Sequence, residues 1–373
     1  MALEQRCQSL ILNGNSLDSH GFATLGNLLR FNTCLERLHL KRERLSAANS
    51  TALWEGLLET PTTALKELVL NFCRFADPSS LNTFCEALKH NATLEHLDLG
   101  GCYLNDSQVA ELLTALAGHS NLKKLVLTLN SCHEQGSQAL GKLLSHPNCK
   151  LSYLNLSHQR DDKYEYEQQN QNAGQHLQPQ DKVRIEPLSQ GLASNISLEY
   201  LKISRNRLED ADIIPLIQAL KRNTTLKTLD LNNNELTMSD GVECIGEALP
   251  QWKGLETLHL LLRCNNIDTA VKSCSLVSGV ERNTRLKTLQ LSESFPFHKE
   301  VQYWCAMNRA GRHLLHSKDD IPSALWTHVL AKNSIHNASK IENKKPRGKA
   351  GSSPFHNDSL YHLLRQGSAV LHR

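Results

Sequence analysis

The stretch Leu94–Asn121, LEHLDLGGCYLNDSQVAELLTALAGHSN, decides the fold of this chain. Leucines at its first, fourth and sixth positions alternate as they do in a short β-strand that turns one face toward a core. Asp106 and Ser107 then offer a helix N-cap, and apolar residues recur after them at helical spacing. The stretch therefore predicts a strand, a turn and a helix.

The signature that opens this stretch, Leu-x-x-Leu-x-Leu, occurs ten times. Its copies start at Cys7 (in place of Leu), Leu35, Leu65, Leu94, Leu122, Leu151, Leu198, Leu226, Leu255 and Leu286. Successive starts lie 28 to 31 residues apart, except for one interval of 47. A fixed period in this range is typical of a solenoid, in which each unit buries its apolar face only against its neighbours. We therefore expect an α/β solenoid with parallel strands on the concave side and helices on the convex side.

Composition narrows the classes of partner and cofactor. The chain has 373 residues, a net charge of +3 and eleven cysteines, with no C-x-x-C pair. The small net charge argues against nucleic-acid and membrane partners, and the scattered cysteines indicate neither a metal site nor a disulfide framework. No run of eighteen apolar residues occurs. We expect no cofactor and a cytoplasmic location, with nuclear import through the basic residues of 340–354 as the alternative.

One position, three residues before the next signature, is often Asn. It is filled by Asn32, Asn91, Asn195, Asn223 and Asn283, and three of these match the N-x-S/T glycosylation pattern. A helix must end at this position, and Asn tolerates the left-handed conformation of a helix C-cap. A structural role is therefore favoured over glycosylation, which would require secretion.

The ninth position of the signature is Asn or Cys in six repeats, namely Asn15, Cys73, Cys102, Asn130, Asn206 and Asn234. Here the chain resembles the leucine-rich repeat family, whose pattern is L-x-x-L-x-L-x-x-N/C-x-L. Its period, with a full helix, is similar to the ribonuclease inhibitor subtype. The resemblance implies a horseshoe and ninth side chains that bond to the backbone of the turn. We expect irregular turns where the pattern fails, at Glu43, Gln159, Arg263 and Ser294.

The repeats predict a domain over residues 1–297, of about ten repeats, with an inserted loop near 159–182. Two amphipathic helices within 298–335 are expected to cap the last repeat. The composition of residues 336–373 predicts a basic, largely disordered tail with a short helix near 358–366.

The third, fifth and seventh positions of each signature should line the concave face. Tyr153 and Tyr200 are the only aromatic residues among them, and Lys124 and Lys202 are expected beside them. Tyrosine next to charged side chains is common at interface hot spots, although ordinary surface explains such residues equally well. The predicted partner-binding residues are Arg37, His39, His96, Asp98, Lys124, Tyr153, Tyr200, Lys202, Asp230 and His259. We expect the three histidines to be solvated.

Catalytic motifs are missing from the sequence. It contains no G-x-x-x-x-G-K-[ST] loop, no zinc-type helix motif and no nucleophile elbow, so we predict no catalytic or metal-binding residues. We expect a monomeric, non-catalytic scaffold that binds another protein. The family resemblance leaves two alternatives: a GTPase-activating regulator similar to the Ran activators, and the ligand-sensing part of an immune-type receptor. An acidic tail follows the repeats in the Ran activators, whereas residues 340–373 hold seven basic and two acidic side chains.

Overall fold

The computed structural model describes residues 7–58, 64–159, 183–237, 240–261, 274–292 and 297–310, together with Phe295 and Arg312. Ten short strands in these residues form one sheet in which every neighbouring pair is parallel. In sheet order they are β1 (Ser9–Ile11), β2 (Arg37–His39), β4 (Glu67–Val69), β6 (His96–Asp98), β7 (Lys124–Val126), β8 (Tyr153–Asn155), β9 (Tyr200–Lys202), β10 (Thr228–Asp230), β11 (Thr257–His259) and β12 (Thr288–Gln290). A separate two-stranded sheet joins β3 (Arg44–Leu45) to β5 (Arg74–Phe75).

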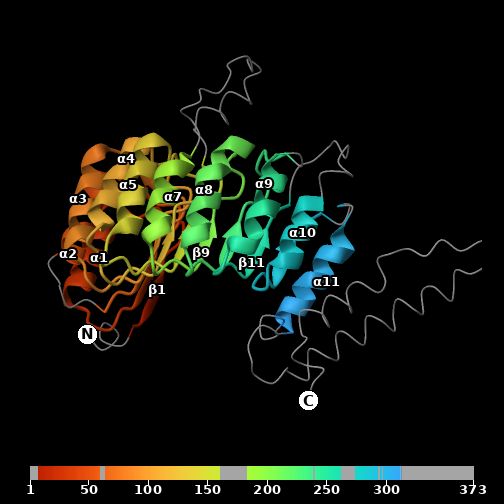
Figure 1. The fold of residues 1–373 in the computed structure, drawn as a ribbon. Helices are drawn as coiled ribbons and strands as arrows, with labels where there is room; N and C mark the ends of the chain where they lie inside the picture. Colours follow the sequence, from red (N-terminus) through yellow and green to blue (C-terminus); the bar gives the residue numbers. More distant parts are fainter. Residues whose placement is uncertain are drawn as a thin grey trace, which may run out of the picture.

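The helices form a second layer on one side of the sheet, as Figure 1 shows. They are α1 (Ser19–Phe31), α2 (Ala47–Leu58), α3 (Pro78–His90), α4 (Asp106–Leu116), α5 (Glu134–Ser145), α7 (Ile185–Ser194), α8 (Asp210–Arg222), α9 (Gly241–Ala248) with a 3₁₀ turn (Leu249–Gln251), α10 (Cys274–Arg282) and α11 (His298–Arg309). Each helix from α1 to α10 returns the chain to start the next parallel strand. The predicted α/β solenoid, with strands on the concave side and helices on the convex side, is confirmed.

The strand register follows the repeats without a slip. Leu97 pairs with Leu68 on one side and Leu125 on the other, so equivalent residues of successive signatures lie side by side. Leu97 is fully buried, whereas its neighbour Asp98 is only partly buried. The alternation predicted for this strand is therefore confirmed, and the concave face consists of the positions between the leucines.

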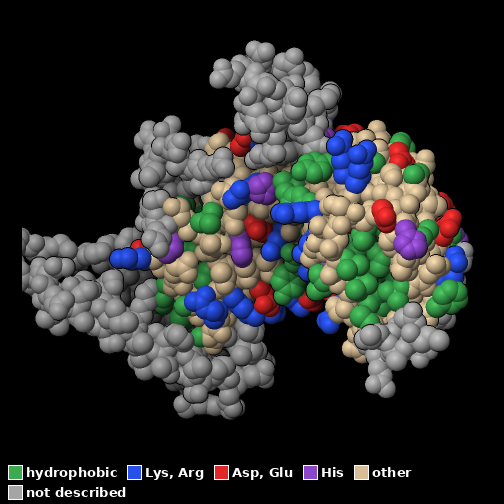
Figure 2. All heavy atoms as spheres, turned by 180° about the vertical axis from the view of Figure 1, so that it is seen from behind, with side chains coloured by type: hydrophobic (Ala, Val, Ile, Leu, Met, Phe, Trp, Pro, Cys, Tyr) green, Lys and Arg blue, Asp and Glu red, His purple; other side chains and the backbone are tan. Residues whose placement is uncertain are grey.

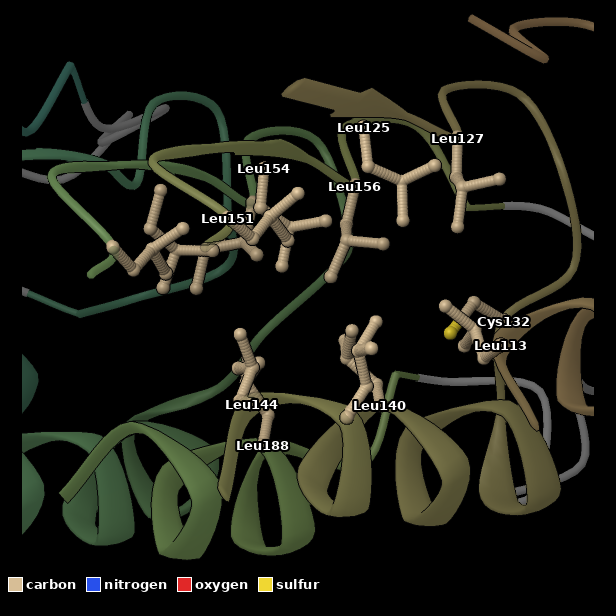
Figure 3. Close-up of a cluster of buried hydrophobic side chains, with 14 of the residues drawn as sticks. Leu113, Leu125, Leu127, Cys132, Leu140, Leu144, Leu151, Leu154, Leu156 and Leu188 are labelled. Atoms are coloured by element: carbon tan, nitrogen blue, oxygen red, sulfur yellow. The ribbon is translucent and has the colours of Figure 1, made fainter. Parts of the chain in front are cut away.

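The hydrophobic core lies between the strands and the helices. Figure 3 shows Leu125, Leu127 and Leu154 of the strand layer pointing toward Leu140 and Leu144 of α5, and all five are buried. Neither layer could bury this surface alone, because each short strand has leucines on one side only. The stability of one repeat therefore depends on its neighbours.

Buried polar side chains at the ninth position tie the turns of adjacent repeats together. Nδ2 of Asn130 donates a hydrogen bond to the carbonyl of Leu99 at 2.9 Å, and the thiols of Cys73 and Cys102 donate to carbonyls of the preceding repeat. Burial raises the pKa of the Cys73 thiol to about 12, so it stays protonated and able to donate. This is the role that the family resemblance implies. Asn15 differs, because it is exposed in the first described repeat.

Our prediction of irregular turns at Glu43 and Gln159 is wrong. The buried carboxylate of Glu43 accepts hydrogen bonds from the backbone N–H groups of Asn15, Ser16 and Leu17 at 2.8–3.1 Å. The Gln159 amide accepts from the backbone N–H of Cys132 and donates to the Leu127 carbonyl. A longer side chain with the same acceptor oxygen can therefore replace Asn at the ninth position. Arg263 and Ser294 lie outside the described residues.

The five shared asparagines form a second ladder, at the helix ends. Oδ1 of each one accepts hydrogen bonds from the backbone N–H groups two and three residues later, and all five are buried. The predicted left-handed conformation is wrong, because Asn32, Asn91, Asn195 and Asn223 have extended backbone. Asn therefore suits this position because its side-chain oxygen accepts these hydrogen bonds, and not because it tolerates a left-handed backbone. Nδ2 of Asn223 also donates to the carbonyls of Leu192 and Asn195, which supports the structural role of this position.

His119 takes the place of the ladder asparagine in its repeat. Its Nδ1 accepts from the backbone N–H of Leu122 at 3.2 Å, and its buried Nε2 has no hydrogen-bond partner among the described residues. Burial lowers the pKa of His119 below its ordinary value. The unfolded chain therefore binds this proton at a higher pH than the folded chain does. Neutral His119 therefore contributes fully to the free energy of unfolding above about pH 6.5. That contribution is lost as the pH falls from there through the pKa of the folded state.

We expect His119→Asn to reduce the acid sensitivity of the fold, because an uncharged amide restores the ladder without a proton to bind. Thermal unfolding between pH 7.5 and pH 5.5 should show a smaller fall in melting temperature for this variant than for the wild type. His20→Asn, at an exposed position of α1, is the matched control. Equal slopes for wild type and His119→Asn would contradict the role assigned to this ring.

An asparagine also joins the last described helix to the repeat before it. Nδ2 of Asn308 in α11 donates to the carbonyls of Asn283 and Leu286 at 2.9 and 2.8 Å, which attaches α11 to the last strand-bearing repeat. Residues 160–182 of the predicted insertion, the second predicted cap helix and the tail 336–373 lie outside the described residues. In the described part of the chain, no helix combines the length and the apolarity needed to cross a bilayer.

Candidate partner-binding surface

The strand side of the molecule carries a mixture of basic, acidic and histidine side chains. Figure 2 shows this side, opposite the helices of Figure 1, with blue, red and purple side chains interspersed. The ten residues predicted to bind a partner are distributed over strands β2, β6, β7, β8, β9, β10 and β11. They lie at half-buried or exposed positions between fully buried leucines.

Four of the ten residues form one cluster at the centre of the sheet, which we call the tyrosine–lysine cluster: Lys124, Tyr153, Tyr200 and Lys202. Tyr153 and Tyr200 are directly paired on β8 and β9, and their ring centroids lie 6.2 Å apart. Nζ of Lys124 lies 5.3 Å from the Tyr153 centroid, and Nζ of Lys202 lies 5.6 Å from it. Both distances are within cation–π range. Tyr200 is the more exposed tyrosine, with 41% of its surface accessible.

A second cluster lies beside it, on β2, β4 and β6. Nε2 of His39 lies 2.9 Å from Oε1 of Glu67, and Nδ1 of His96 lies 3.5 Å from the same oxygen. Our expectation of solvated histidines is wrong for these two, because the in-register strands place Glu67 between them. Burial, and next the charge of Lys124, lower the pKa of His96. Glu67 was not among the predicted residues, although its third position in the signature places it on this face.

The remaining predicted residues lie apart from these clusters or are engaged locally. Oδ1 of Asp98 accepts from Nδ2 of Asn71 at 2.6 Å and from the backbone N–H of Gly100 at 2.9 Å. Asp230 accepts from the backbone N–H of Asn232. Arg37 is exposed on β2, while His259 on β11 is half-buried. None of the described residues forms a group of three His, Cys, Asp or Glu side chains suited to hold a metal ion.

Ion pairs along the second position of the signatures are a feature that our sequence reasoning missed. They join Lys66 to Glu36, Lys123 to Glu95, Lys227 to Glu199 and Lys287 to Glu256, with N–O distances of 2.6–2.8 Å. The alternation of Glu and Lys at this position is the signal that could have revealed them, given parallel strands in register. Because all eight side chains are well exposed, these pairs contribute little stability.

Comparison with known proteins finds sequence similarity to proteins that contain leucine-rich repeats. No family model matches it. The NACHT, LRR and PYD domains-containing protein 9B of Mus musculus is 34% identical over 156 residues, which cover 41% of this chain and 15% of that protein. The NACHT, LRR and PYD domains-containing protein 12 of Homo sapiens is 35% identical over 147 residues, or 39% of this chain and 14% of that protein.

The ribonuclease inhibitor of Mus musculus is 30% identical over 206 residues, which cover 55% of this chain and 40% of the inhibitor. Among solved structures, an internalin from Listeria monocytogenes aligns with 79% of this chain and 85% of its own, at 16% identity and a TM-score of 0.41. The chain thus spans less than half the length of the ribonuclease inhibitor and of the two NACHT, LRR and PYD domains-containing proteins. Its repeats and this sequence similarity identify a leucine-rich repeat region of the ribonuclease inhibitor-like subtype, homologous to those of the ribonuclease inhibitor and of the NACHT, LRR and PYD domains-containing proteins.

Proposed function

We propose that the chain is a non-catalytic scaffold that binds another protein through its concave strand face. The observation that carries the proposal is the tyrosine–lysine cluster, in which two aromatic rings and two ammonium groups meet on three adjacent strands. Tyrosine is enriched at interface hot spots because it offers a large contact area and a polar hydroxyl while few torsions are lost. Leucine-rich repeat regions of the related subtype typically bind proteins, which favours the same function.

The size of the face also supports a protein partner. Ten strands at a spacing of about 4.8 Å extend over roughly 40 Å, enough for a standard interface of about 800 Å² per partner. The tyrosine–lysine cluster lies on β7, β8 and β9, in the middle of that row, where surrounding contacts can exclude water. The other predicted residues would then contact the edges of the partner.

We also propose that the protein acts in a reducing compartment such as the cytoplasm. The described cysteines are free thiols, and several of them are buried donors or core residues. Buried thiols that donate hydrogen bonds in the ladder serve the fold only while they remain reduced.

A second candidate function is that of the repeat region within a larger, multidomain receptor. The observation in its favour is the sequence similarity to several proteins whose names record NACHT and PYD domains besides the repeats. An immunoblot of the native protein tests this candidate. A band near 41.8 kDa would favour the scaffold, and a band two or more times larger would favour the receptor.

The scaffold proposal is tested by affinity capture with a fourfold variant of the cluster. Lys124→Glu, Tyr153→Ala, Tyr200→Ala and Lys202→Glu together should abolish recovery of the partner, because they remove the aromatic surface and reverse its charge. The matched control reverses two charges and shortens two side chains at exposed helix positions: Gln138→Ala, Lys142→Glu, Gln218→Ala and Arg222→Glu. Circular dichroism should show that both variants keep the fold. Full recovery by the cluster variant would contradict the proposal.

A further inference from the structure

The lysines of the tyrosine–lysine cluster differ from the lysines at the second position of the signatures. Lys123 and Lys227 each hold a glutamate across the strands, at 2.7 and 2.6 Å. Among the described residues, by contrast, no carboxylate lies within ion-pair distance of Lys124 or Lys202, although Lys124 directly follows Lys123. The centre of the concave face therefore carries two ammonium groups that form no ion pair in the described part of the protein.

Nearby carboxylates are already engaged elsewhere. Asp98, on the strand next to Lys124, is held by Asn71 and the Gly100 backbone, and Glu67 lies between His39 and His96. The lowered pKa of His96, caused first by burial and then by the charge of Lys124, is consistent with a positive potential at this place. Asp230 is paired with Lys202 across β10 and β9, where its carboxylate accepts a hydrogen bond from the backbone N–H of Asn232 and forms no ion pair with Lys202 among the described residues.

The two ammonium groups are also held in place. Each lies over the Tyr153 ring, so its side chain has less rotational freedom to lose when a ligand binds. Their separation cannot exceed the sum of their two distances to that ring. In an extended segment, residues two positions apart lie about 6.6 Å from each other and point to the same side. That spacing falls within this upper limit, and the flexible side chains of Asp or Glu allow each carboxylate to approach one lysine.

We infer that the partner presents an acidic segment, with Asp or Glu at alternate positions, to Lys124 and Lys202 on either side of Tyr153. This inference rests on the proposed function and specifies its chemistry. The carboxylates would form charge-assisted hydrogen bonds with the two ammonium groups, while the backbone between them would lie over the tyrosine rings and the intervening side chain would point away. A partner with a basic contact surface would be repelled at the same place.

The test measures fluorescence anisotropy of defined probes with the full chain at low salt. The probes are fluorescein-labelled dodecapeptides that alternate Ser with Glu, Gln or Lys, and a labelled twelve-residue oligothymidylate. We expect the Glu peptide to bind at least tenfold more tightly than the Gln or Lys peptide, and its affinity to fall as salt rises from 50 to 300 mM. Lys124→Met with Lys202→Met should weaken that binding at least tenfold.

The matched control replaces the paired lysines, with Lys123→Met and Lys227→Met, and alters the net charge by the same amount. It should retain binding of the Glu peptide within about threefold. If the control loses as much affinity as the cluster variant, general charge explains binding and the inference is overturned. Equal or tighter binding of oligothymidylate would overturn it in favour of a nucleic acid. If the Glu peptide does not bind while the fourfold cluster variant still loses its captured protein, the acidic segment is refuted and the scaffold proposal stands.

Discussion

Gly141→Ala should destabilise the protein by about 3 kcal/mol, although it adds a single methyl group. A Cβ atom at Gly141 in α5 would lie 2.3 Å from the carbonyl oxygen of Pro187 in α7. The next helix repeats the arrangement, because a Cβ at Gly191 would lie 2.4 Å from the Gly141 carbonyl. The obstacle is backbone, which cannot move aside as a flexible side chain can. The helices would have to separate and the core between them would open.

Chemical denaturation measured by circular dichroism checks this expectation, with Gly118→Ala as the control. Gly118 is exposed, and a Cβ there would meet no atom within 4 Å. The control should leave the free energy of unfolding within about 0.5 kcal/mol of the wild type, since it adds no contact. A loss of under about 1 kcal/mol for Gly141→Ala would contradict the close approach of α5 and α7.

Asn223→Ala should cost about 3 kcal/mol, because it removes a side chain that bonds to four backbone groups. Its Oδ1 accepts from the N–H groups of Thr225 and Leu226, and its Nδ2 donates to the carbonyls of Leu192 and Asn195. Alanine would leave the two N–H groups without this acceptor and would remove one of two donors from each carbonyl, since Leu192 also accepts from the Asn195 backbone N–H and Asn195 from the Thr225 hydroxyl. Each buried polar group left unpaired costs about 1–3 kcal/mol, and partial relaxation reduces the total.

Asn148→Ala is the control for the asparagine ladder, since the Asn148 side chain is exposed. Equilibrium unfolding in urea should separate the two variants clearly, with the control near the wild type. Asn223→Asp, which keeps the acceptor oxygen and loses the amide donor, should fall between them. If Asn223→Ala unfolded at the same urea concentration as the wild type, the asparagine ladder would contribute no stability. Glycosylation would then be the favoured role of Asn223.

The strand register could be predicted from the sequence because three leucines per repeat give an unambiguous alternation. Once Leu125, Leu154 and Leu201 are aligned in parallel, Tyr153 must face Tyr200 and Lys124 must lie beside Tyr153. The tyrosine–lysine cluster was therefore predictable as a neighbourhood. Its role in binding is not contained in that geometry and stays a proposal.

Other features had no local signal. Phe72 and Leu129 occupy the eighth position of their repeats with φ of 59° and 55°, a left-handed conformation that neither residue type favours. Their backbone N–H groups bond to the carbonyls of Gly100 and Ser157 in the next repeat, a contact that the propensities of Phe and Leu do not predict. Glu43 was misjudged because its function depends on backbone groups 26 to 28 residues earlier in the chain. The same holds for Glu67, whose position between two histidines depends on three strands at once.

Site-specific photocrosslinking in cells tests most directly whether the concave face is the binding surface. A photoreactive amino acid in place of Thr228, paired with Tyr200 across β10 and β9, reports on this face, and one in place of Gln218 on α8 reports on the helices. The account predicts a discrete crosslinked protein from position 228 and none from position 218. The same protein crosslinked from position 218 and not from 228 would contradict it.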